Sequence, residues 1–316
     1  MGLKTVVLNS ERMNYDGKLD LSVLSSEVKE YASTEQDQIL ERVQGMDVVV
    51  TKEMPVDGDT IALFPDSVQL ICEAGTGYNN IDIEAARARG ITVCNIPAYS
   101  TERVAHTAIM MILNLSSSMQ IQQAMLARGD RSNFTKCMQV SHVEVNGKVL
   151  GVVGAGTIGR EVIKVAQALG MKVLAYTRTP RADEDNLKYV SLEELLKQSD
   201  YISLHCPLTP QTRHMINKET IAMMKPTAYI INTGRGALID EPALIEALKE
   251  GRIAGAGLDV QETEPPVQNN PLYDMPNVIL TPHMGWKGLE TRQRLVSILA
   301  ANIQAFDEGR PQNVVS

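Results

Sequence analysis

A short glycine-rich turn constrains the fold of this 316-residue chain more than any other feature. Residues 148–154 (KVLGVVG) have the composition of a buried strand. Gly154, Gly156 and Gly159 follow in G-x-G-x-x-G spacing as a helical pattern begins. In this setting the first glycine permits a tight turn, the second lets the backbone approach a pyrophosphate, and the third lets helix and strand pack closely. The turn therefore predicts a dinucleotide site, and this setting disfavours the alternative that its glycines serve packing alone.

The runs that follow this turn alternate between strand and helix patterns. The helix patterns begin with recognisable caps: Ser191 and Glu194 form a capping box, and Pro242 lies in the first turn of a helix that ends at Gly251. The strand runs are 148–154, 172–177, 201–206, 228–233, 255–260 and 277–281. This alternation predicts a doubly wound, parallel-sheet nucleotide-binding domain of the Rossmann type over residues 100–286.

The first hundred residues repeat the alternation on a smaller scale. Their strand runs are 5–9, 47–51, 69–73 and 91–95. Near the other end of the chain, one helical stripe of apolar residues needs a surface to cover. It consists of Leu295, Val296, Leu299, Ile303 and Phe306. We therefore expect an α/β chain of two parallel-sheet domains, in which residues 1–99 and 287–316 form a smaller, discontinuous, flavodoxin-like substrate domain.

Charge and cysteine usage exclude several classes of protein. Lysine and arginine number 30 and aspartate and glutamate 38, a net charge of −8 with no basic run, so we expect no nucleic-acid partner. No apolar stretch is long enough to span a membrane, and the first residues lack a signal-peptide pattern. The dispersed cysteines indicate neither disulfides nor zinc, and no other cluster has metal-ligand spacing, so we expect a metal-free protein of the reducing cytoplasm. The cysteines are Cys72, Cys94, Cys137 and Cys206.

The end of the second strand run indicates which dinucleotide binds. A Rossmann turn is usually followed, about 20 residues on, by an acidic residue that holds the ribose hydroxyls. Here that place is taken by Thr177, with Arg178 and Arg181 close behind. No carboxylate is present there to repel a 2′-phosphate, and two guanidiniums can bind one. The pattern favours NADP over NAD, although two solvated surface arginines would look the same.

Three motifs at successive strand ends carry the chemistry. NTGRG contains Arg235, LDVQETEP contains Asp259 and Glu264, and TPHMGW contains His283. An arginine flanked by glycines can bind a carboxylate through two hydrogen bonds, and a histidine beside a carboxylate suits acid–base catalysis near neutral pH. Each motif alone has a structural explanation, but their joint placement after a dinucleotide turn argues against coincidence.

These motifs and their order resemble the D-isomer-specific 2-hydroxyacid dehydrogenase family along nearly the whole chain. The segments that carry the resemblance are EAGTGYNNIDIEAARARGITVCNIPAYSTERVAH, GKVLGVVGAGTIGR, HCPLTPQT, MKPTAYIINTGRGALID, AGAGLDVQETEPP and VILTPHMGW. NIPAYST and TPHMGW are most similar to the glycerate dehydrogenase, or hydroxypyruvate and glyoxylate reductase, branch. The resemblance implies hydride transfer between a nicotinamide and a small 2-oxo acid, in a cleft that closes between two domains.

The resemblance also implies roles for single residues. Arg235 would bind the substrate carboxylate and carbonyl, His283 would exchange a proton with the substrate oxygen, and Glu264 would stabilise the protonated histidine. Backbone N–H groups of Thr76 and Gly77, and with less support Lys52, would contact the substrate. Asp259 would hold the nicotinamide carboxamide. The other residues implied to contact the cofactor are Val104, Thr157, Ile158, Cys206, Pro207, Thr233 and Gly285.

Several alternatives stay open at this stage. Thr177 departs from the acidic residue of NAD-dependent members, and His106 stands where many relatives carry Glu or Gln, so we expect His106 to be structural or at the cofactor's edge. Hydroxypyruvate and glyoxylate are favoured by resemblance, and 3-phosphoglycerate is disfavoured because no arginine cluster accompanies the substrate loops. A dinucleotide-sensing binding module without turnover is the alternative from another class. Homodimerisation through the cofactor domain is implied by resemblance alone.

Overall fold

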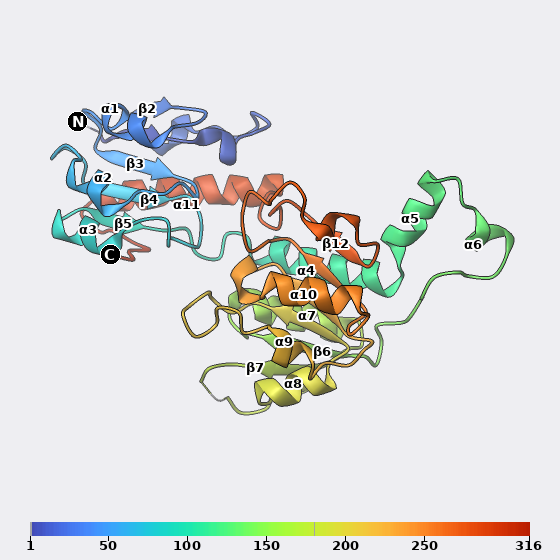
Figure 1. Cartoon of the computed structure of the whole chain (residues 1–316). Coiled ribbons are helices and arrows are strands. Elements are labelled where there is room, and N and C mark those ends of the chain that lie inside the picture. The colour runs from blue at the N-terminus through green and yellow to red at the C-terminus, as the bar shows by residue number, and fades with distance from the viewer. Residues whose placement is uncertain (1, 180) are drawn as a thin grey trace. The chain divides into compact units, whose positions relative to one another are not determined.

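The computed structural model describes residues 2–179 and 181–316 and divides into two compact units. The first unit contains the chain up to Ser100 together with Trp286–Ser316, and the second contains Thr101–Gly285. Each unit is built on one parallel β-sheet with helices on both faces (Figure 1). The two sheets confirm the α/β fold class that the alternating pattern predicts.

The sheet of the first unit has the strand order β2-β1-β3-β4-β5, which is the flavodoxin-like order. Side chains of successive residues in β3 point to opposite faces, as the pleat requires. Val48 and Val50 pack with α11 on one face, and Val49 packs with residues of α1, α2 and α3 on the other. The strands are β1 (Lys4–Val7), β2 (Glu27–Glu30), β3 (Val48–Thr51), β4 (Leu70–Glu73) and β5 (Thr92–Cys94). The helices are α1 (Ile39–Arg42), α2 (Gly58–Ala62), α3 (Ile83–Ala88) and α11 (Leu289–Asp307).

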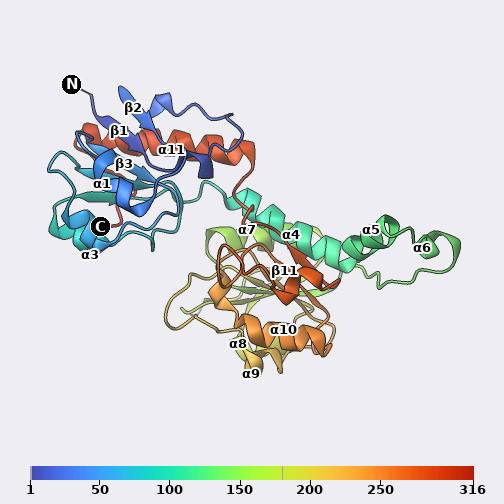
Figure 2. The same cartoon turned by 45° about the horizontal axis from the view of Figure 1, so that its top comes forward.

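The helix α11 returns to the first unit and covers one face of its sheet (Figure 2). Leu295, Leu299 and Ile303 of the predicted apolar stripe are buried there. Arg292, at the start of the same helix, pairs with Asp16 through two hydrogen bonds of 2.7 and 2.8 Å. The terminal segment is therefore joined to the first hundred residues by both apolar and ionic contacts.

The sheet of the second unit has seven strands in the order β12-β11-β10-β9-β6-β7-β8. The helices α4 and α7 pack on one face, and α8, α9 and α10 on the other. The strands are β6 (Val149–Val153), β7 (Lys172–Tyr176), β8 (Leu187–Tyr189), β9 (Tyr201–Leu204), β10 (Tyr229–Asn232), β11 (Gly255–Leu258) and β12 (Val278–Leu280). The helices are α4 (Thr101–Ser116), α5 (Met119–Ala127), α6 (Ser132–Thr135), α7 (Thr157–Ala168), α8 (Leu192–Gln198), α9 (Lys218–Ile221) and α10 (Glu241–Lys249).

The sequence patterns do not predict two short edge strands, β2 and β8. The residues of β2 (EVKE) are largely exposed, and β8 has three residues of which only Leu187 is buried. An edge strand needs backbone pairing with one neighbour and little apolar burial, so its side chains carry a weak hydrophobic signal.

Candidate active site

The residues of the second unit that the sequence motifs single out lie at the carboxyl edge of its sheet. Gly154 follows β6, Arg235 follows β10, Asp259 follows β11 and His283 follows β12. These strands are parallel and lie in the order β12-β11-β10-β9-β6, so the loops after them share one edge. The connections reverse direction between β6 and β9, and this is where such sheets bind ligands.

Three glycines shape the turn between β6 and α7. Gly154 has φ +99°, and a Cβ there would lie 2.6 Å from the backbone nitrogen of Cys206. A Cβ on Gly159 would lie 2.0 Å from the carbonyl oxygen of Gly154, so only glycine allows helix and turn to approach so closely. Gly156 faces open space, with nothing within 4 Å of a Cβ. The N–H groups of Thr157 and Ile158, the first two residues of α7, therefore lie beside the uncovered backbone of Gly156, which is the geometry of an anion site.

A buried hydroxyl at the same edge lacks a protein partner. Thr233 follows β10 and is only 7% exposed, yet its Oγ1 forms no hydrogen bond with the described residues. Buried polar groups normally have a partner, so this one fits a ligand atom. The glycine turn, the helix N-terminus and this hydroxyl together fit a dinucleotide along the edge of the sheet. Cys206 and Pro207 follow β9, and the backbone nitrogen of Cys206 lies beside Gly154, where it can border the same ligand.

The buried carboxylate of Asp259 organises the loop after β12. Asp259 is 1% exposed, and its Oδ1 accepts hydrogen bonds from the Thr281 hydroxyl (2.5 Å) and the Met284 N–H (2.8 Å). Its Oδ2 accepts the N–H of Gly285 at 2.7 Å. A Cβ on Gly285 would lie 2.9 Å from that oxygen and 3.5 Å from Val104 of α4. Asp259 therefore serves first as the anchor of this loop, a role that the motif alone does not reveal.

The loop held by Asp259 presents His283. Its N–H donates to the carbonyl of Asp259 at 2.8 Å, and its φ of +48° places it in the left-handed region. Such a conformation costs energy in a residue with a side chain and persists because the surrounding bonds enforce it. The Nδ1 of His283 lies 2.8 Å from Oε2 of Glu264, whose Oε1 accepts the N–H of Gln261 at 3.1 Å.

This pairing fixes the roles of the two ring nitrogens. Because a carboxylate accepts hydrogen bonds, Nδ1 carries the proton that faces Glu264. The Nε2 of His283 has no hydrogen-bond partner in the described part of the chain, which leaves it to face a ligand. The side chains of His283 and Glu264 are 23% and 38% exposed, so both can be reached from solvent.

Arg235 is a partly buried cation without an anionic partner. Its NH1 donates to the carbonyl of Gly234 at 2.9 Å, and no carboxylate pairs with it among residues 2–179 and 181–316. Asn232 holds the turn through its side chain, which donates to the Arg235 carbonyl and accepts the Gly234 N–H. A Cβ on Gly236 would lie 1.9 Å from the carbonyl oxygen of Gln261, so this turn packs against the loop that carries Glu264.

The end of β7 carries the two exposed arginines. The Thr177 hydroxyl donates to the carbonyl of Thr179 at 2.7 Å, and neither Arg178 nor Arg181 forms a salt bridge with a described carboxylate. Nearby, Arg160 of α7 pairs with Glu184 at 2.8 Å. The hydrogen bond from Arg160 and, to a smaller extent, the charge of Arg181 lower the pKa of Glu184, so Arg181 lies near this carboxylate. Arg178 and Arg181 are both exposed.

In the first unit, the turn after β4 offers two unused N–H groups. The residues that follow β5 hold this turn from one side. The Ile96 N–H donates to the Gly75 carbonyl, the Thr76 hydroxyl donates to the Ile96 carbonyl, and the Asn95 side-chain amide donates to the Thr76 carbonyl. The backbone N–H groups of Thr76 and Gly77 donate to no acceptor in the described chain. Two fixed, partly exposed donors of this kind suit a carboxylate.

Lys52, by contrast, is withdrawn from solvent. Its side chain is 2% exposed, and its Nζ lies 2.5 Å from Oε1 of Glu53 and 4.2 Å from the centre of the Trp286 ring. The Asn9 side chain holds the Lys52 backbone through two hydrogen bonds of 2.7 and 2.9 Å. This burial argues for a supporting position beneath the turn.

The remaining histidines differ in their surroundings. His106 is exposed on α4, and His142 is exposed on the segment before β6. His205 lies 2.8 Å from the Ser203 hydroxyl, and burial lowers its pKa to about 4. His214 lies 2.6 Å from Glu262. Four further residues belong to the networks of hydrogen bonds and charges around Asp259 and Lys52. The sequence does not single them out, because their contacts depend on the fold. They are Glu53, Glu73, Thr281 and Trp286.

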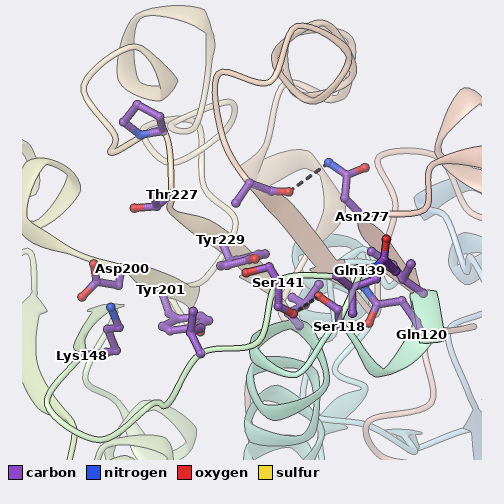
Figure 3. A pocket seen from close by; sticks show the side chains of 16 residues that line it. Ser118, Gln120, Gln139, Ser141, Lys148, Asp200, Tyr201, Thr227, Tyr229 and Asn277 are labelled. Carbon is purple, nitrogen blue, oxygen red and sulfur yellow. Dashed lines mark hydrogen bonds between the residues drawn. The ribbon is translucent and has the colours of Figure 1, made fainter. Parts of the chain in front are cut away.

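The large hollow of the second unit lies at the opposite edge of the sheet. It has a volume of about 600 Å³, and Figure 3 shows Lys148, Asp200, Tyr229 and Asn277 around it, all next to the amino ends of strands. Ligands of doubly wound sheets bind at the carboxyl ends, so this hollow is separate from the site described above. Within the described residues, no group of three metal-ligating side chains comes together, and no helix is long and apolar enough to cross a membrane.

The chain is similar to known proteins of one family. Residues 109–285 match the NAD-binding domain of the D-isomer-specific 2-hydroxyacid dehydrogenases. The chain is 40% identical to a hydroxypyruvate reductase of Blautia hydrogenotrophica, over 90% of this chain and 89% of that protein. It is 42% identical to a glycerate dehydrogenase of Methylorubrum extorquens, over 92% of each. A solved glyoxylate reductase from Paecilomyes thermophila superimposes with a TM-score of 0.85 at 32% identity, over 99% of this chain and 98% of that one.

Proposed function

The chain belongs to the D-isomer-specific 2-hydroxyacid dehydrogenase family, and from this premise we propose that it reduces hydroxypyruvate or glyoxylate with NADPH. Membership makes it an oxidoreductase that uses a nicotinamide cofactor and a small 2-hydroxy or 2-oxo acid. One observation carries the assignment of its site: a partly buried arginine that pairs with no carboxylate of the described residues lies at the same sheet edge as a carboxylate-paired histidine. The names of the similar proteins support the choice of substrates.

Each side chain at this edge has its own role toward the substrate. Arg235 binds the carboxylate of the 2-oxo acid and draws electron density toward its carbonyl oxygen. His283 gives the proton on Nε2 to that oxygen during reduction and takes it back during oxidation. Glu264 holds the ring by Nδ1 and stabilises the imidazolium form. The N–H groups of Thr76 and Gly77 act as further donors to the carboxylate.

The second unit provides the cofactor site. The turn of Gly154, Gly156 and Gly159 and the first N–H groups of α7 hold the pyrophosphate, and Thr233 supplies a hydroxyl. When bound, the nicotinamide supplies or accepts the hydride. Asp259 and Gly285, with Val104, shape the edge that receives the carboxamide end. Arg178 and Arg181 bind the 2′-phosphate, because no carboxylate stands at Thr177 to repel it.

Initial rates with both acids and both reduced cofactors test the function and the cofactor together. We expect turnover with hydroxypyruvate or glyoxylate, and a lower KM for NADPH than for NADH. Arg181→Ala removes a charge-assisted hydrogen bond and should raise the KM for NADPH about tenfold while leaving that for NADH unchanged.

The matched control for this test is Lys172→Ala, which removes an equal charge at the amino end of β7. Turnover that prefers NADH would keep the enzyme class and contradict the 2′-phosphate site. If the chain bound dinucleotide tightly but turned over none of a panel of 2-oxo acids, 3-phosphoglycerate included, the binding-module alternative would replace this proposal.

The acid–base role of His283 predicts a separation of turnover from cofactor binding. His283→Gln keeps a polar side chain of similar length but cannot transfer a proton, so kcat should fall about 10²- to 10⁴-fold. Dinucleotide affinity, measured by fluorescence titration, should stay within about twofold because the glycine turn is untouched. His142→Gln, an exposed substitution, is the control. Full activity of His283→Gln would remove the assignment.

We further propose that the protein is a homodimer through the arm that contains α5 and α6. The arm extends away from the sheet of the second unit in both views (Figures 1 and 2). No residue of α5 is buried, although a nine-residue helix is unstable alone in water, so its faces need a partner. Phe134 is 74% exposed and Met138 51%. The hollow beside the base of the arm offers surface for the partner's arm (Figure 3).

Sedimentation equilibrium tests this assembly. The wild-type chain should sediment at twice its mass of 34.7 kDa, and Phe134→Asp should shift the population toward monomer by placing a charge in the contact. Leu63→Asp, which changes another exposed apolar residue in the first unit, should leave the dimer intact. A monomeric wild type would contradict the proposal.

All four cysteines are free thiols, which supports a reducing, cytoplasmic location.

A further inference from the structure

A buried charged cluster lies directly beneath the carboxylate-binding turn of the first unit. Lys52 and Glu53 follow β3, and Glu73 ends the adjacent strand β4, in register with Thr51. A Cβ built on Gly75 would lie 3.1 Å from both the Glu73 carboxylate and the Lys52 ammonium, so these groups flank the first residue of the turn. Charged side chains are rarely fully buried without a purpose for fold or function.

We propose that Glu73 is a positioning residue for the anionic substrate: it supports the Gly75–Gly77 turn from below, and its charge state controls how strongly that turn binds a carboxylate. This inference rests on the proposed function, which places the substrate carboxylate on Thr76 and Gly77. Glu73 is the first residue of the EAGTGYNN segment, but the resemblance assigns it no role.

The support is visible in the hydrogen bonds of Glu73. Its Oε1 accepts the backbone N–H of Glu53 at 3.0 Å, and its Oε2 accepts the side-chain amide of Asn80 at 2.9 Å. Asn80 belongs to the same loop as Thr76 and also donates to the Met54 carbonyl at 2.8 Å. Glu53 has a φ of +54°, a strained conformation that its bond to Glu73 helps to hold. One carboxylate therefore joins the loop after β3 to the loop after β4.

The net charge of this cluster explains how Glu73 controls the binding of the substrate carboxylate. Lys52 is a cation and Glu53 an anion in contact with it, so ionised Glu73 leaves these three groups with one net negative charge beneath the turn. Protonated Glu73 leaves them neutral. A negative charge there opposes a substrate carboxylate, and within about 10 Å at a protein-like dielectric constant it weakens binding on the order of tenfold.

The surroundings of Glu73 place this change near neutral pH. Burial raises its pKa to about 7, against the opposing effects of the Lys52 charge, the Glu53 N–H and Asn80. Glu53 raises it further. The neighbouring thiols of Cys72 and Cys94 have a pKa raised by burial, to about 11 for Cys94, so neither ionises in this range. Substrate affinity should therefore fall as the pH rises through 7.

Binding of oxamate to the full chain loaded with NADPH tests the inference without turnover. Oxamate carries the carboxylate and carbonyl of a 2-oxo acid, and calorimetry at pH 6 and pH 8.5 gives its Kd. The decisive quantity is the ratio of the wild-type Kd to that of Glu73→Gln, which keeps an acceptor but stays neutral, because this ratio cancels every pH effect that the two proteins share. We expect this ratio to rise about tenfold between the two values of pH. Glu84→Gln, an exposed change on α3, should behave as wild type.

Trp286 gives a second measurement that needs no ligand. It is the chain's single tryptophan, and its ring contacts the Lys52 ammonium. Its fluorescence should titrate near pH 7 in wild type and lose this step in Glu73→Gln. A Kd ratio independent of pH, or a wild-type fluorescence without that step, would overturn the inference.

The outcomes separate this inference from the proposed function. If oxamate binds with the expected change in ratio but no 2-oxo acid is reduced, the proposed function fails and the role of Glu73 stands. If hydroxypyruvate is reduced but the Kd ratio does not change with pH, the proposed function stands and the role of Glu73 is overturned. Absence of any oxamate binding would overturn the inference.

Discussion

The active edge of this protein depends on one buried carboxylate. Asp259 accepts hydrogen bonds from Thr281, Met284 and Gly285, and its carbonyl accepts the N–H of His283. A carboxyl group buried to this degree needs hydrogen-bond donors for its oxygens, and the same donors fix the loop. Asp259 thereby determines where the histidine lies and stabilises its left-handed backbone. Glu264 can orient the imidazole only because the loop already holds it in place.

The two units use the same device for different tasks. In each, a parallel sheet brings distant segments to one carboxyl edge, where glycine turns expose backbone N–H groups to an anion. In the proposed function, the turn after β6 in the second unit binds the cofactor pyrophosphate, and the turn after β4 in the first unit binds the substrate carboxylate. Asp259 and Glu73 both lie at strand ends and support the neighbouring loops. They differ in their donors, and burial raises the pKa of Glu73 to about 7.

The sequence predicts the elements whose signal is local. The G-x-G-x-x-G spacing indicates the turn before α7, the apolar runs indicate the central strands, and the stripe of α11 indicates a buried terminal helix. What the sequence does not show depends on register. Lys52 and Glu73 are 21 positions apart and meet only because β3 pairs with β4. Likewise Thr281 becomes a partner of Asp259 only once β12 lies beside β11, and the polar strand β2 has no apolar run to reveal it.

Hydrogen exchange at the loop after β12 tests the account most directly. In wild type the amides of Met284 and Gly285 should be protected by their bonds to Asp259. Asp259→Ala should accelerate their exchange at least about tenfold and lower turnover, whereas Asp274→Ala, an exposed change in the same unit, should do neither. Unchanged protection and full turnover in Asp259→Ala would show that another interaction positions His283 and would contradict the central role given to this carboxylate.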